Sequence, residues 1–535
     1  MRVRFVKRLS KAPVGNWLSP FSIALAAAAL SAAACAAPTH ASAAAPLREI
    51  RFAISTDTPT SMPGNVLRNA YTDEILANVV ESLVALKSDL SIGPMLADSW
   101  SISPDGKRYT FHLRHGVTFQ NGAPLTSAEV KWSYDYLMEP RSGYVCRSNY
   151  NGQRGPKVLA VTTPDPYTVV FELERPSALF LTRMTELRCP LAVLHPSSVG
   201  ANGEWIKPVA TGPFVFSEWK QGQYVLLTPY AGYKPRSEPS SGLAGAKRAE
   251  ANVRIVAIPD EAAQLSALMS GQIDAMNISE NNLPPSDPKW HLISGAGADP
   301  AALLMQTRDP LLSDPRMRRA IALAVDLRGV VDAVSGGRAR YNPSLTPAAD
   351  DLYTPTDAIG YQQSLAEVKR LLAQVGYKGE TLTLKTNRRY PHMYSAAVYL
   401  QSLLSQAGIN VKLQVLEWGT QADDFHSGNF QLMSFGYSAR IEPALMYGDV
   451  LGDKSRNPMV QWENPQARAL LRSLDSVTDN STRKEVFAQL HQMMLADAPM
   501  IVLYDSPDLT LVSNRLHGMG TWPLRTKRFF NVTKN

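Results

Sequence analysis

Cysteine is scarce in this sequence. Among 535 residues there are three, Cys35, Cys146 and Cys189, and no two of them form a Cys-x-x-Cys pair. That absence excludes the paired-cysteine zinc sites and the thioredoxin-like redox motif. If Cys35 is removed with an N-terminal segment, Cys146 and Cys189 remain as an even pair. In an oxidising compartment we expect them to form a disulfide closing a loop of roughly 40 residues; the alternative is two buried thiols.

Catalytic and metal-binding motifs are also missing. The sequence has no Gly-x-Ser-x-Gly elbow, no His-Glu-x-x-His and no Walker-type phosphate loop, and its nine histidines show no metal-ligand spacing. We therefore expect neither an enzyme nor a cofactor. An extracytoplasmic hydrolase is the alternative from a different class, and His392 and His426 are the histidines left for a metal in a cleft.

Long apolar runs and excess charge are confined to the N-terminus. Beyond residue 45 no apolar stretch reaches the length of a membrane span, which excludes a polytopic membrane protein. The formal net charge is +7, but five basic residues and no acid lie in the first 45 positions, which leaves +2 for the rest. A nearly neutral chain gives no reason to expect a nucleic-acid partner or an anionic membrane surface.

Residues 1–43 are predicted to be a secretory signal. They begin with basic residues, continue with an apolar, alanine-rich stretch of about 14 residues and end in small residues, with cleavage expected after Ala43. The apolar stretch is shorter than a comfortable membrane span. Cys35 raises the alternative of a lipid-anchored cysteine. Lipoprotein signals usually have Leu three residues before that cysteine, whereas this sequence has Ala32.

The first part of the remaining chain is rich in predicted strands. Residues 99–126 alternate apolar and polar positions around the turn signals Asp105-Gly106 and Asn121-Gly122, which predicts a β-meander. A helix with a capping box is predicted over 126–138, because Glu129 follows a candidate N-cap threonine by three residues.

The second part is rich in predicted helices. Apolar residues there recur with helical spacing in five segments, at 314–326, 363–375, 395–407, 464–478 and 482–497. Short strands are predicted between them. The chain is therefore expected to have an α/β core in each part, and it shows no internal repeat.

Six stretches together resemble one family, the periplasmic peptide-, opine- and nickel-type solute-binding proteins of ABC importers. The stretch PMLADSWSISPDGKRYTFHLRHGVTFQNGAPLTSAEVKWSYDYL at 94–137 has an order of motifs that is close to diagnostic for this family. The others follow in the family's order and together cover nearly all of the chain after the signal; they lie at 210–235, 258–274, 314–331, 400–418 and 483–504.

The resemblance implies an α/β, bilobal periplasmic-binding-protein fold, type II-like and of cluster C, whose two α/β lobes are joined by a two-crossing hinge. It implies lobe I at 47–290 with an extra strand-rich subdomain at about 75–200, lobe II at 291–498, and a C-terminal return to lobe I at 499–535. A hinge of this kind lets two lobes close around a ligand.

The function implied by the resemblance is that of a monomeric receptor in the periplasm. It captures a small-molecule, peptide or peptide-like ligand, does no chemistry on it, and delivers it to the transmembrane permease subunits of an ABC importer. A nickel- or haem-binding receptor of the same fold is the alternative. Signalling by the loaded form to a membrane sensor is a further role that does not exclude transport.

The resemblance also places a carboxylate-binding arginine. Dipeptide-binding members carry Arg-Pro-Tyr before a long helix of the second lobe, and the matching segment here is TNRRYPHMY at 386–394. Arg388 is the counterpart of the arginine, with Arg389 as its rival, and Tyr390 matches the tyrosine. A guanidinium suits a carboxylate because it donates two parallel hydrogen bonds. Alternatively, both arginines lie on a solvated loop and one pairs with an acid.

Arg440 departs from the family pattern. Peptide-binding members have Gly-Trp followed shortly by an Asp that binds the peptide's α-ammonium, whereas FGYSARIEPALMY at 435–447 has Arg440 in that place. A buried cation there repels an ammonium, so we expect an anionic ligand such as an opine-like conjugate, a blocked or γ-linked peptide such as glutathione, or a sugar phosphate. Alternatively, Arg440 pairs with Glu442 or another acid.

Two aromatic residues are expected to line the cleft. Tyr437 stands where the family has its Trp, and Trp418 ends one of the stretches that carry the resemblance. Either is alternatively part of the core, as aromatic residues usually are. Main-chain groups of residues 56–63 are expected to add contacts from the rim of the first lobe.

Overall fold

The computed structural model describes residues 48–55 and 70–535 except positions 441 and 478. Leu47–Asn535 forms one compact unit. The predicted signal at 1–43, with Cys35, and the predicted rim segment at 56–63 lie outside the described residues. Within the described ranges, no helix has both the length and the apolar character needed to cross a membrane.

One mixed sheet of eleven strands organises the unit. Ten strands follow one another in a single order, and an eleventh, β13, pairs with β17. In spatial order they are β15 (Val411–Leu416), β14 (Leu382–Asn387), β16 (Leu432–Gly436), β12 (Trp290–Met305), β17 (Met500–Ser513), β11 (Ala275–Asn277), β1 (Glu49–Ile54), β10 (Asn252–Ala257), β9 (Tyr224–Pro229) and β8 (Phe214–Lys220), and β13 is Arg340–Tyr341.

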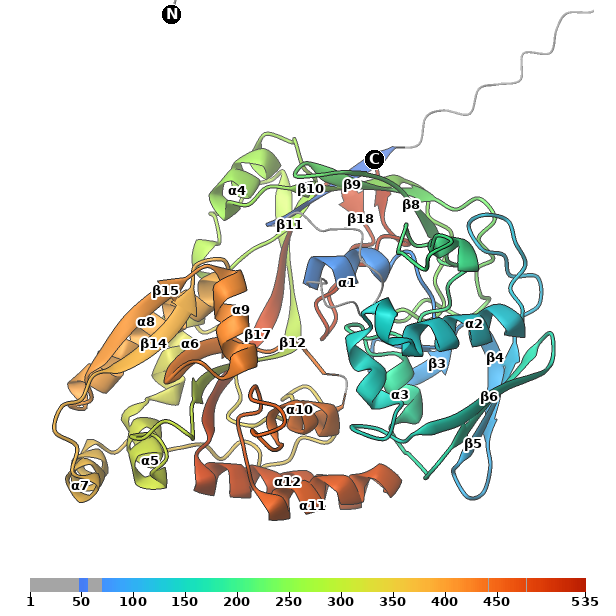
Figure 1. Cartoon of the computed structure of the whole chain (residues 1–535). Helices are drawn as coiled ribbons and strands as arrows, with labels where there is room; N and C mark the ends of the chain where they lie inside the picture. The colour runs from blue at the N-terminus through green and yellow to red at the C-terminus, as the bar shows by residue number, and fades with distance from the viewer. Residues whose placement is uncertain (1–47, 56–69, 441, 478) are drawn as a thin grey trace, which may run out of the picture. The chain divides into compact units, whose positions relative to one another are not determined.

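The two long strands β12 and β17 occupy the middle of this sheet and pair antiparallel (Figure 1). Their register runs from Trp290 opposite Ser513 to Leu304 opposite Met500, with an irregularity between Gly295 and Asp299. β16 pairs with the end of β12, whereas β11 pairs with the end of β17. The two strands therefore join two groups of strands that lie on opposite sides of them.

Helices of the second part pack against the strands β14, β15 and β16 and against one another. Most of them begin at a capping side chain or at a proline, which answers the free backbone N–H groups of a helix start. They are α5 (Pro315–Ala324), α6 (Leu327–Ser335), α7 (Leu365–Val375), α8 (Pro391–Gln406), α9 (Trp418–Ser427), α10 (Pro443–Val450), α11 (Pro465–Ser473) and α12 (Asn480–Asp497).

The five helices predicted in the second part are confirmed, but their first or last residues differ from the predicted ones. The helix predicted at 395–407 begins four residues earlier, because Pro391 at the first helical position has no N–H to satisfy. The one predicted at 464–478 ends at Ser473 and continues as a short 3₁₀ turn, Leu474–Ser476.

A separate four-stranded antiparallel sheet lies in the first part, in the order β4 (Ala97–Ile102), β5 (Arg108–Leu113), β7 (Thr168–Leu173), β6 (Val158–Asp165). The predicted hairpin around Gly106 is confirmed as β4 and β5. The second half of the predicted meander is wrong, since the turn at Gly122 is flanked by a single bridge between Thr118 and Pro124.

The predicted capping box is confirmed at helix α2 (Ser127–Met138). Thr126 accepts from the Ala128 backbone N–H at 3.3 Å, and Glu129 accepts from the Thr126 backbone N–H at 2.9 Å. The remaining elements are short. They are α1 (Ala70–Leu76), β2 (Val84–Leu86), β3 (Ile92–Pro94), α3 (Phe180–Met184), α4 (Glu261–Met269), β18 (Leu516–His517), β19 (Thr533–Lys534) and the 3₁₀ turns Pro140–Ser142, Val145–Asn149, Pro196–Ser198 and Glu280–Asn282.

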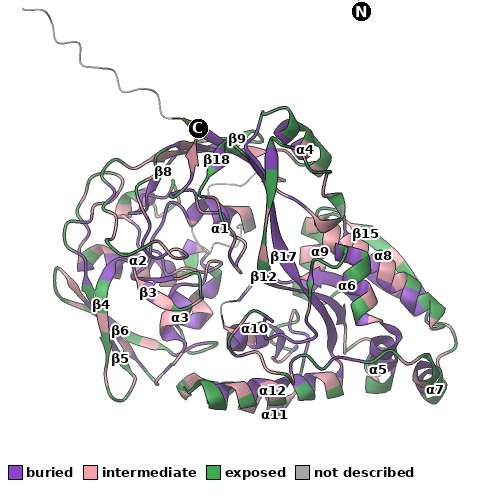
Figure 2. Ribbon diagram, turned by 180° about the vertical axis from the view of Figure 1, so that it is seen from behind, coloured by how far each residue is buried: buried purple, intermediate pink, exposed green. Residues whose placement is uncertain are grey.

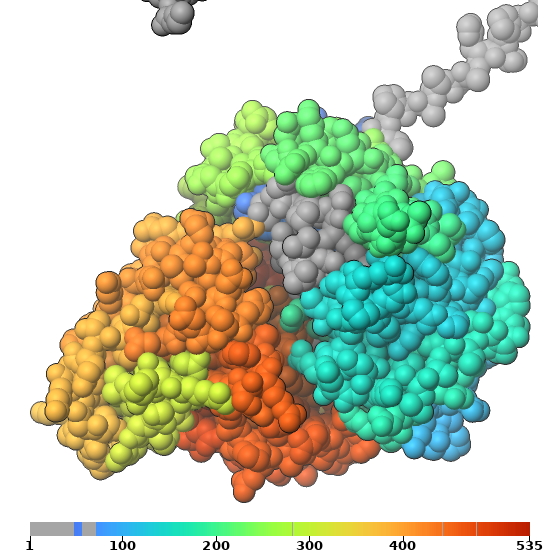
Figure 3. Space-filling view, viewed as in Figure 1, coloured from blue at the N-terminus to red at the C-terminus, as the bar shows by residue number. Residues whose placement is uncertain are grey.

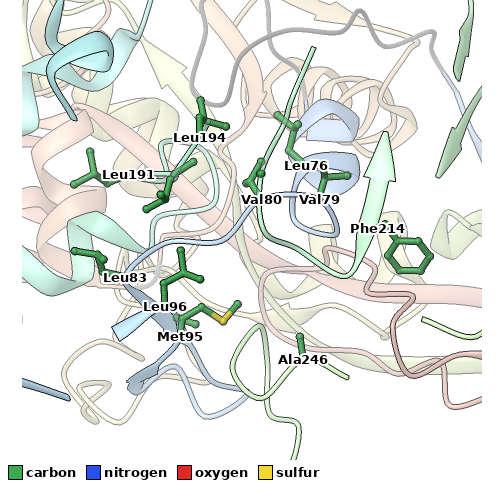
Figure 4. Packing of buried hydrophobic residues seen from close by; sticks show 14 of the residues in the cluster. Leu76, Val79, Val80, Leu83, Met95, Leu96, Leu191, Leu194, Phe214 and Ala246 are labelled. Atoms are coloured by element: carbon green, nitrogen blue, oxygen red, sulfur yellow. The ribbon is translucent and has the colours of Figure 1, made fainter. Parts of the chain in front are cut away.

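Buried apolar side chains form distinct clusters on the two sides of the central strands, and β12 and β17 are buried along most of their length between them (Figure 2). In the first part, residues following α1 pack against segments that are distant in sequence (Figure 4). The side chains drawn there include Leu76, Val80, Leu96, Leu191, Leu194, Phe214 and Ala246. Another cluster joins Leu86 and Leu179 of the first part to residues of α10 and α12.

Candidate ligand-binding site

The predicted ligand residues gather where parallel strands end. β14 pairs in parallel with both β15 and β16. Arg388, Arg389 and Tyr390 directly follow β14, Trp418 follows β15 by two positions, and Tyr437 directly follows β16. Because the carboxyl ends of parallel strands lie at one edge of a sheet, the fold brings these residues to the same edge, where open α/β sheets bind ligands.

Three of the predicted residues join one row of aromatic rings. The ring of Tyr390 lies 4.8 Å from that of Trp418, Trp418 lies 6.1 Å from Phe435, and Phe435 lies 5.1 Å from Tyr437. Tyr390 and Trp418 are half-buried, whereas Tyr437 is buried. The Tyr437 hydroxyl forms no hydrogen bond with any residue in the described ranges. The row offers stacking surface at its half-buried end and a hydroxyl at its buried end.

The two candidate arginines differ in what they contact. Arg388 is exposed, lies 4.3 Å from the ring centre of Tyr394, and donates from Nη2 to the Tyr394 hydroxyl at 2.9 Å. It is therefore held against α8. Arg389 is also exposed, and its positive charge acts on the phenol of Tyr71 in α1, although burial raises the pKa of Tyr71 overall. Of the two, Arg389 is the one within electrostatic reach of the first part of the chain.

Arg440 is buried and already paired. Its Nε and Nη2 donate to Asp449 Oδ2 at 2.8 and 2.5 Å, and its Nη1 donates to the carbonyls of Ser438 and Ala439. Glu186 Oε1 lies 3.5 Å from its Nε. The structure therefore agrees with the alternative expected for Arg440, which is pairing with an acid, since each guanidinium nitrogen has an acceptor and Asp449 lies against it.

The acid that pairs with Arg440 is Asp449 and not Glu442. Glu442 instead accepts from Arg483 Nη2 at 2.5 Å. Asp449, which lies in α10, also forms ion pairs with Arg154 and with Arg188, the latter at 3.7 Å. Burial by itself would raise the pKa of Asp449, but the charges of the three arginines outweigh it and hold that pKa well below its usual range.

The arginines that reach Asp449 from the first part lie beside a disulfide. Cys146 and Cys189 are bonded, with their Cα atoms 5.9 Å apart. Arg188 directly precedes Cys189, and Arg154 follows Cys146 by eight positions. The bond therefore ties together the two segments that present Arg154 and Arg188 to α10.

A second polar group, which the sequence did not reveal, lies where β12 is irregular. Asp299 Oδ1 accepts from the Ala439 backbone N–H at 2.7 Å. Its Oδ2 lies 3.5 Å from Arg525 Nη1 and accepts no hydrogen bond from the part of the chain that the structure describes. On the neighbouring β17, Asp508 accepts from Lys527 Nζ at 2.5 Å, and both side chains are buried. No motif marks these residues, since their partners come from distant segments.

Several acids and bases meet in this group. The charges of Asp299, Asp508 and Glu280 all act on Arg525, and Glu74 in α1 is near Lys527. Burial raises the pKa of Glu74 to about 7, although the Lys527 charge and backbone N–H oppose that shift. Burial also raises the pKa of Asp299. Burial therefore favours the neutral form of both carboxyl groups, although cations lie near them.

The histidines left for a metal do not come together. His392 is half-buried, and a Cβ at Gly436 would lie 3.0 Å from its Nε2. Burial and the charge of Arg525 lower the pKa of His392 to about 3, so the ring is neutral. His426 is exposed on α9. Within the described ranges, no group of three or more His, Cys, Asp or Glu side chains is arranged to hold a metal ion.

The site lies where the two parts of the unit face each other. The charge pairs of Asp449 with Arg154 and Arg188 cross from one part to the other, as does the hydrogen bond from the Ala178 backbone N–H to the Asp475 carbonyl at 2.7 Å. In the space-filling view, the orange surface of the second part borders the teal surface of the first part along a hollow (Figure 3).

Comparison with known proteins finds one family. Residues 91–458 match the description "Bacterial extracellular solute-binding proteins, family 5 Middle". A probable deoxycholate-binding periplasmic protein of Escherichia coli (strain K12) is 24% identical over 516 residues, covering 92% of this chain and 93% of that protein. A probable D,D-dipeptide-binding periplasmic protein of the same strain is 25% identical over 452 residues, covering 82% and 83%.

Solved structures share the fold. A periplasmic binding protein from Helicobacter pylori, in complex with the peptide STSA, has a TM-score of 0.79 at 24% identity, covering 91% of this chain and 98% of that one. A dipeptide-binding protein from Pseudoalteromonas sp. SM9913, in complex with Met-Leu, has a TM-score of 0.81 at 18% identity, covering 91% and 100%. The predicted fold class is confirmed: the chain has the bilobal α/β fold of these binding proteins.

Proposed function

Since the chain belongs to the bacterial extracellular solute-binding proteins, family 5, we propose that it is a periplasmic receptor that captures a short peptide or peptide-like ligand between its two lobes for an ABC importer. The relatives solved with STSA and with Met-Leu support a peptide ligand. The lobes proposed are 47–290, with the extra subdomain at about 75–200, and 291–498, with 499–535 returning to the first. The strands β12 and β17 begin at or next to these boundaries and supply the two crossings.

One observation supports a ligand that carries a positive group, namely the half-buried carboxylate of Asp299, whose Oδ2 accepts no hydrogen bond from the residues that the structure describes. An α-ammonium brought to that oxygen supplies a donor and a positive charge. The anionic ligand predicted from Arg440 is not carried forward, because that arginine already donates to Asp449 and to two backbone carbonyls.

The other end of the ligand is assigned to Arg389. Its guanidinium is exposed at the carboxyl end of β14, whereas that of Arg388 is occupied by the Tyr394 ring and hydroxyl. A free carboxylate suits Arg389 because the guanidinium donates two parallel hydrogen bonds. Tyr390 and Trp418 supply aromatic surface for a ligand side chain.

The remaining parts of the proposal rest on the predicted secretory signal and on the family to which the chain belongs. Residues 1–43 act as the secretory signal, and the mature protein works as a monomer that hands its ligand to the transmembrane permease subunits. Binding and release need no covalent bond to be made or broken, so the role proposed is that of a receptor and not of an enzyme.

Thermal unfolding of the mature protein with a ligand panel tests this proposal. The panel contains dipeptides and tripeptides, the same peptides with an acetylated N-terminus, glutathione, an opine conjugate, a sugar phosphate and nickel. A ligand at 1,000 times its dissociation constant stabilises by about 4 kcal/mol, which shifts the midpoint clearly. Free-amine peptides are expected to raise the midpoint more than acetylated ones. Stabilisation by the sugar phosphate or nickel alone would contradict the proposal.

A further inference from the structure

A second pocket lies away from the candidate ligand site, at the opposite edge of the same strands. Its volume is about 640 Å³, within the range of small-molecule sites. It is lined by residues at the starts of β14 and β16 and just beyond the end of β12, such as Thr383, Gln431 and Gln306. Arg389 and Tyr437 follow the other ends of β14 and β16, so the two sites do not share residues.

One lining residue is a buried lysine whose ammonium is held by neutral oxygens. Lys454 is 3% exposed. Its Nζ donates to Gln306 Oε1 at 2.8 Å and to Thr307 Oγ1 at 2.7 Å. A lysine ammonium has three protons, so one remains for a further acceptor. Burial lowers the pKa of Lys454 to about 8, although the charge of Glu463 opposes that shift.

The other two cations of the pocket each have an acid. Lys385 Nζ donates to Asp424 Oδ2 at 2.8 Å. Arg308 donates from Nη2 and Nε to Glu463, at 2.8 and 3.2 Å. Lys454 differs from them because its closest link to an acid is through its own backbone N–H, which donates to Glu463 at 3.0 Å.

The acid that lines the pocket is already bonded to other groups. Asp309 Oδ1 accepts from the backbone N–H groups of Leu311 and Leu312, and its Oδ2 accepts from Gln431 Nε2 at 3.0 Å. The Asp309 carboxylate thus accepts from two backbone N–H groups and from the Gln431 amide, and not from the Lys454 ammonium. The Asp309 carboxylate therefore leaves the remaining proton of the Lys454 ammonium for another acceptor.

We propose that this pocket binds a small molecule through a phosphate or carboxylate group, whose oxygen accepts the remaining proton of the Lys454 ammonium while Arg308 and Lys385 add positive charge at the sides. A charge-assisted hydrogen bond to a buried ammonium is stronger than a neutral one, so a compact oxyanion is preferred to a neutral ligand of the same size.

Calorimetric titration of the mature protein with inorganic phosphate, and separately with acetate, tests the proposal at an ionic strength held constant with sodium chloride. The unmodified protein is expected to bind at least one of the two saturably. The stronger probe identifies whether phosphate or carboxylate is the preferred group. An absence of saturable binding by both probes would overturn the proposal.

Variants of the protein test whether the phosphate or acetate probe binds in the pocket lined by Lys454. Lys454→Gln is expected to weaken the probe at least tenfold, and Arg308→Gln, which lies at the exposed rim, several-fold. Lys369→Gln, which changes an exposed lysine of α7, is expected to leave it unchanged. Arg308→Gln keeps the test decisive if Lys454→Gln does not fold. Equal binding by Arg308→Gln and the unmodified protein, or loss of binding in Lys369→Gln, would contradict the assignment.

Discussion

The guanidinium of Arg440 donates from both Nε and Nη2 to a single oxygen of Asp449, and both side chains are buried. A lone cation at position 440 would repel an ammonium, and the pairing with Asp449 reduces that repulsion. Asp449 also meets Arg154 and Arg188 from the first part of the chain, so the same carboxylate contributes to holding the two parts together.

Replacing Asp449 with Asn is expected to destabilise the protein by about 3 to 5 kcal/mol, since it leaves buried arginine charge without its acid. Chemical denaturation of the mature protein measures the effect. Arg456→Gln is the matched control, because Arg456 is highly exposed and faces Asp453 at 3.8 Å. Exposed pairs of that kind contribute about 0 to 1 kcal/mol. Equal effects of the two variants would show that the Asp449 cluster does not stabilise the fold.

Replacing Asp299 with Asn is expected to weaken a free-amine dipeptide at least tenfold, because a charged acceptor becomes neutral. The acetylated form of the same dipeptide is expected to bind the variant and the unmodified protein alike. Calorimetric titration of both peptides measures this difference. Asp423→Asn, on the exposed face of α9, is the control. A loss that is the same for both peptides would mean that Asp299 acts on the fold and not on the ammonium.

Arg389→Gln is expected to weaken a dipeptide with a free carboxylate at least tenfold, and to change the affinity for the amidated dipeptide little. Arg388→Gln is the matched control, one residue away, and is expected to have the smaller effect since its guanidinium already binds Tyr394. Titration of both peptides against both variants decides the matter. A larger effect of Arg388→Gln would reverse the assignment of the two arginines.

The unliganded protein is expected to lose stability as the pH rises towards neutrality. Burial raises the pKa of Glu74 from an ordinary 4.5 to about 7 in the folded state. A raised folded pKa favours the protonated form, so its contribution is complete below pH 4.5 and disappears as the pH rises through about 7. The difference corresponds to about 3 kcal/mol.

Denaturation at several pH values between about 4.5 and 8 measures this loss. Glu74→Gln, which stays neutral, is expected to reduce the slope. Burial also raises the pKa of Asp505 to about 7, so part of the dependence of stability on pH remains in this variant. An unchanged slope in Glu74→Gln would show that Glu74 titrates normally.

Removing the disulfide with Cys146→Ser and Cys189→Ser is expected to cost about 3 to 4 kcal/mol of stability, since the bond links positions 43 residues apart and restricts the unfolded chain. The midpoint of denaturation measures the loss. Reduction of the unmodified protein is expected to have the same effect. A midpoint unaffected by both treatments would show that the bond does not stabilise this protein.

Parts of the fold with local causes could be predicted from the sequence. The capping box of Thr126 and Glu129 lies within four residues, and the five helical segments repeat their apolar positions every three or four residues. The hairpin at Gly106 was predicted because its turn residues adjoin strands that pair with each other. The turn at Gly122 was mistaken for a second hairpin because its residue types favour a turn whether or not strands continue from it.

The sequence by itself determined the fold class and the family, because ordered motifs are written in consecutive residues. Only the tertiary structure brought Arg388, Arg389, Tyr390, Trp418 and Tyr437 to one edge of the sheet and decided the charge of the site. Asp299 meets Arg525 across more than two hundred positions, and Asp449 meets Arg154 across 295. The effect of a buried charge depends on the partner that folding brings to it, and no spacing in the sequence specifies such partners.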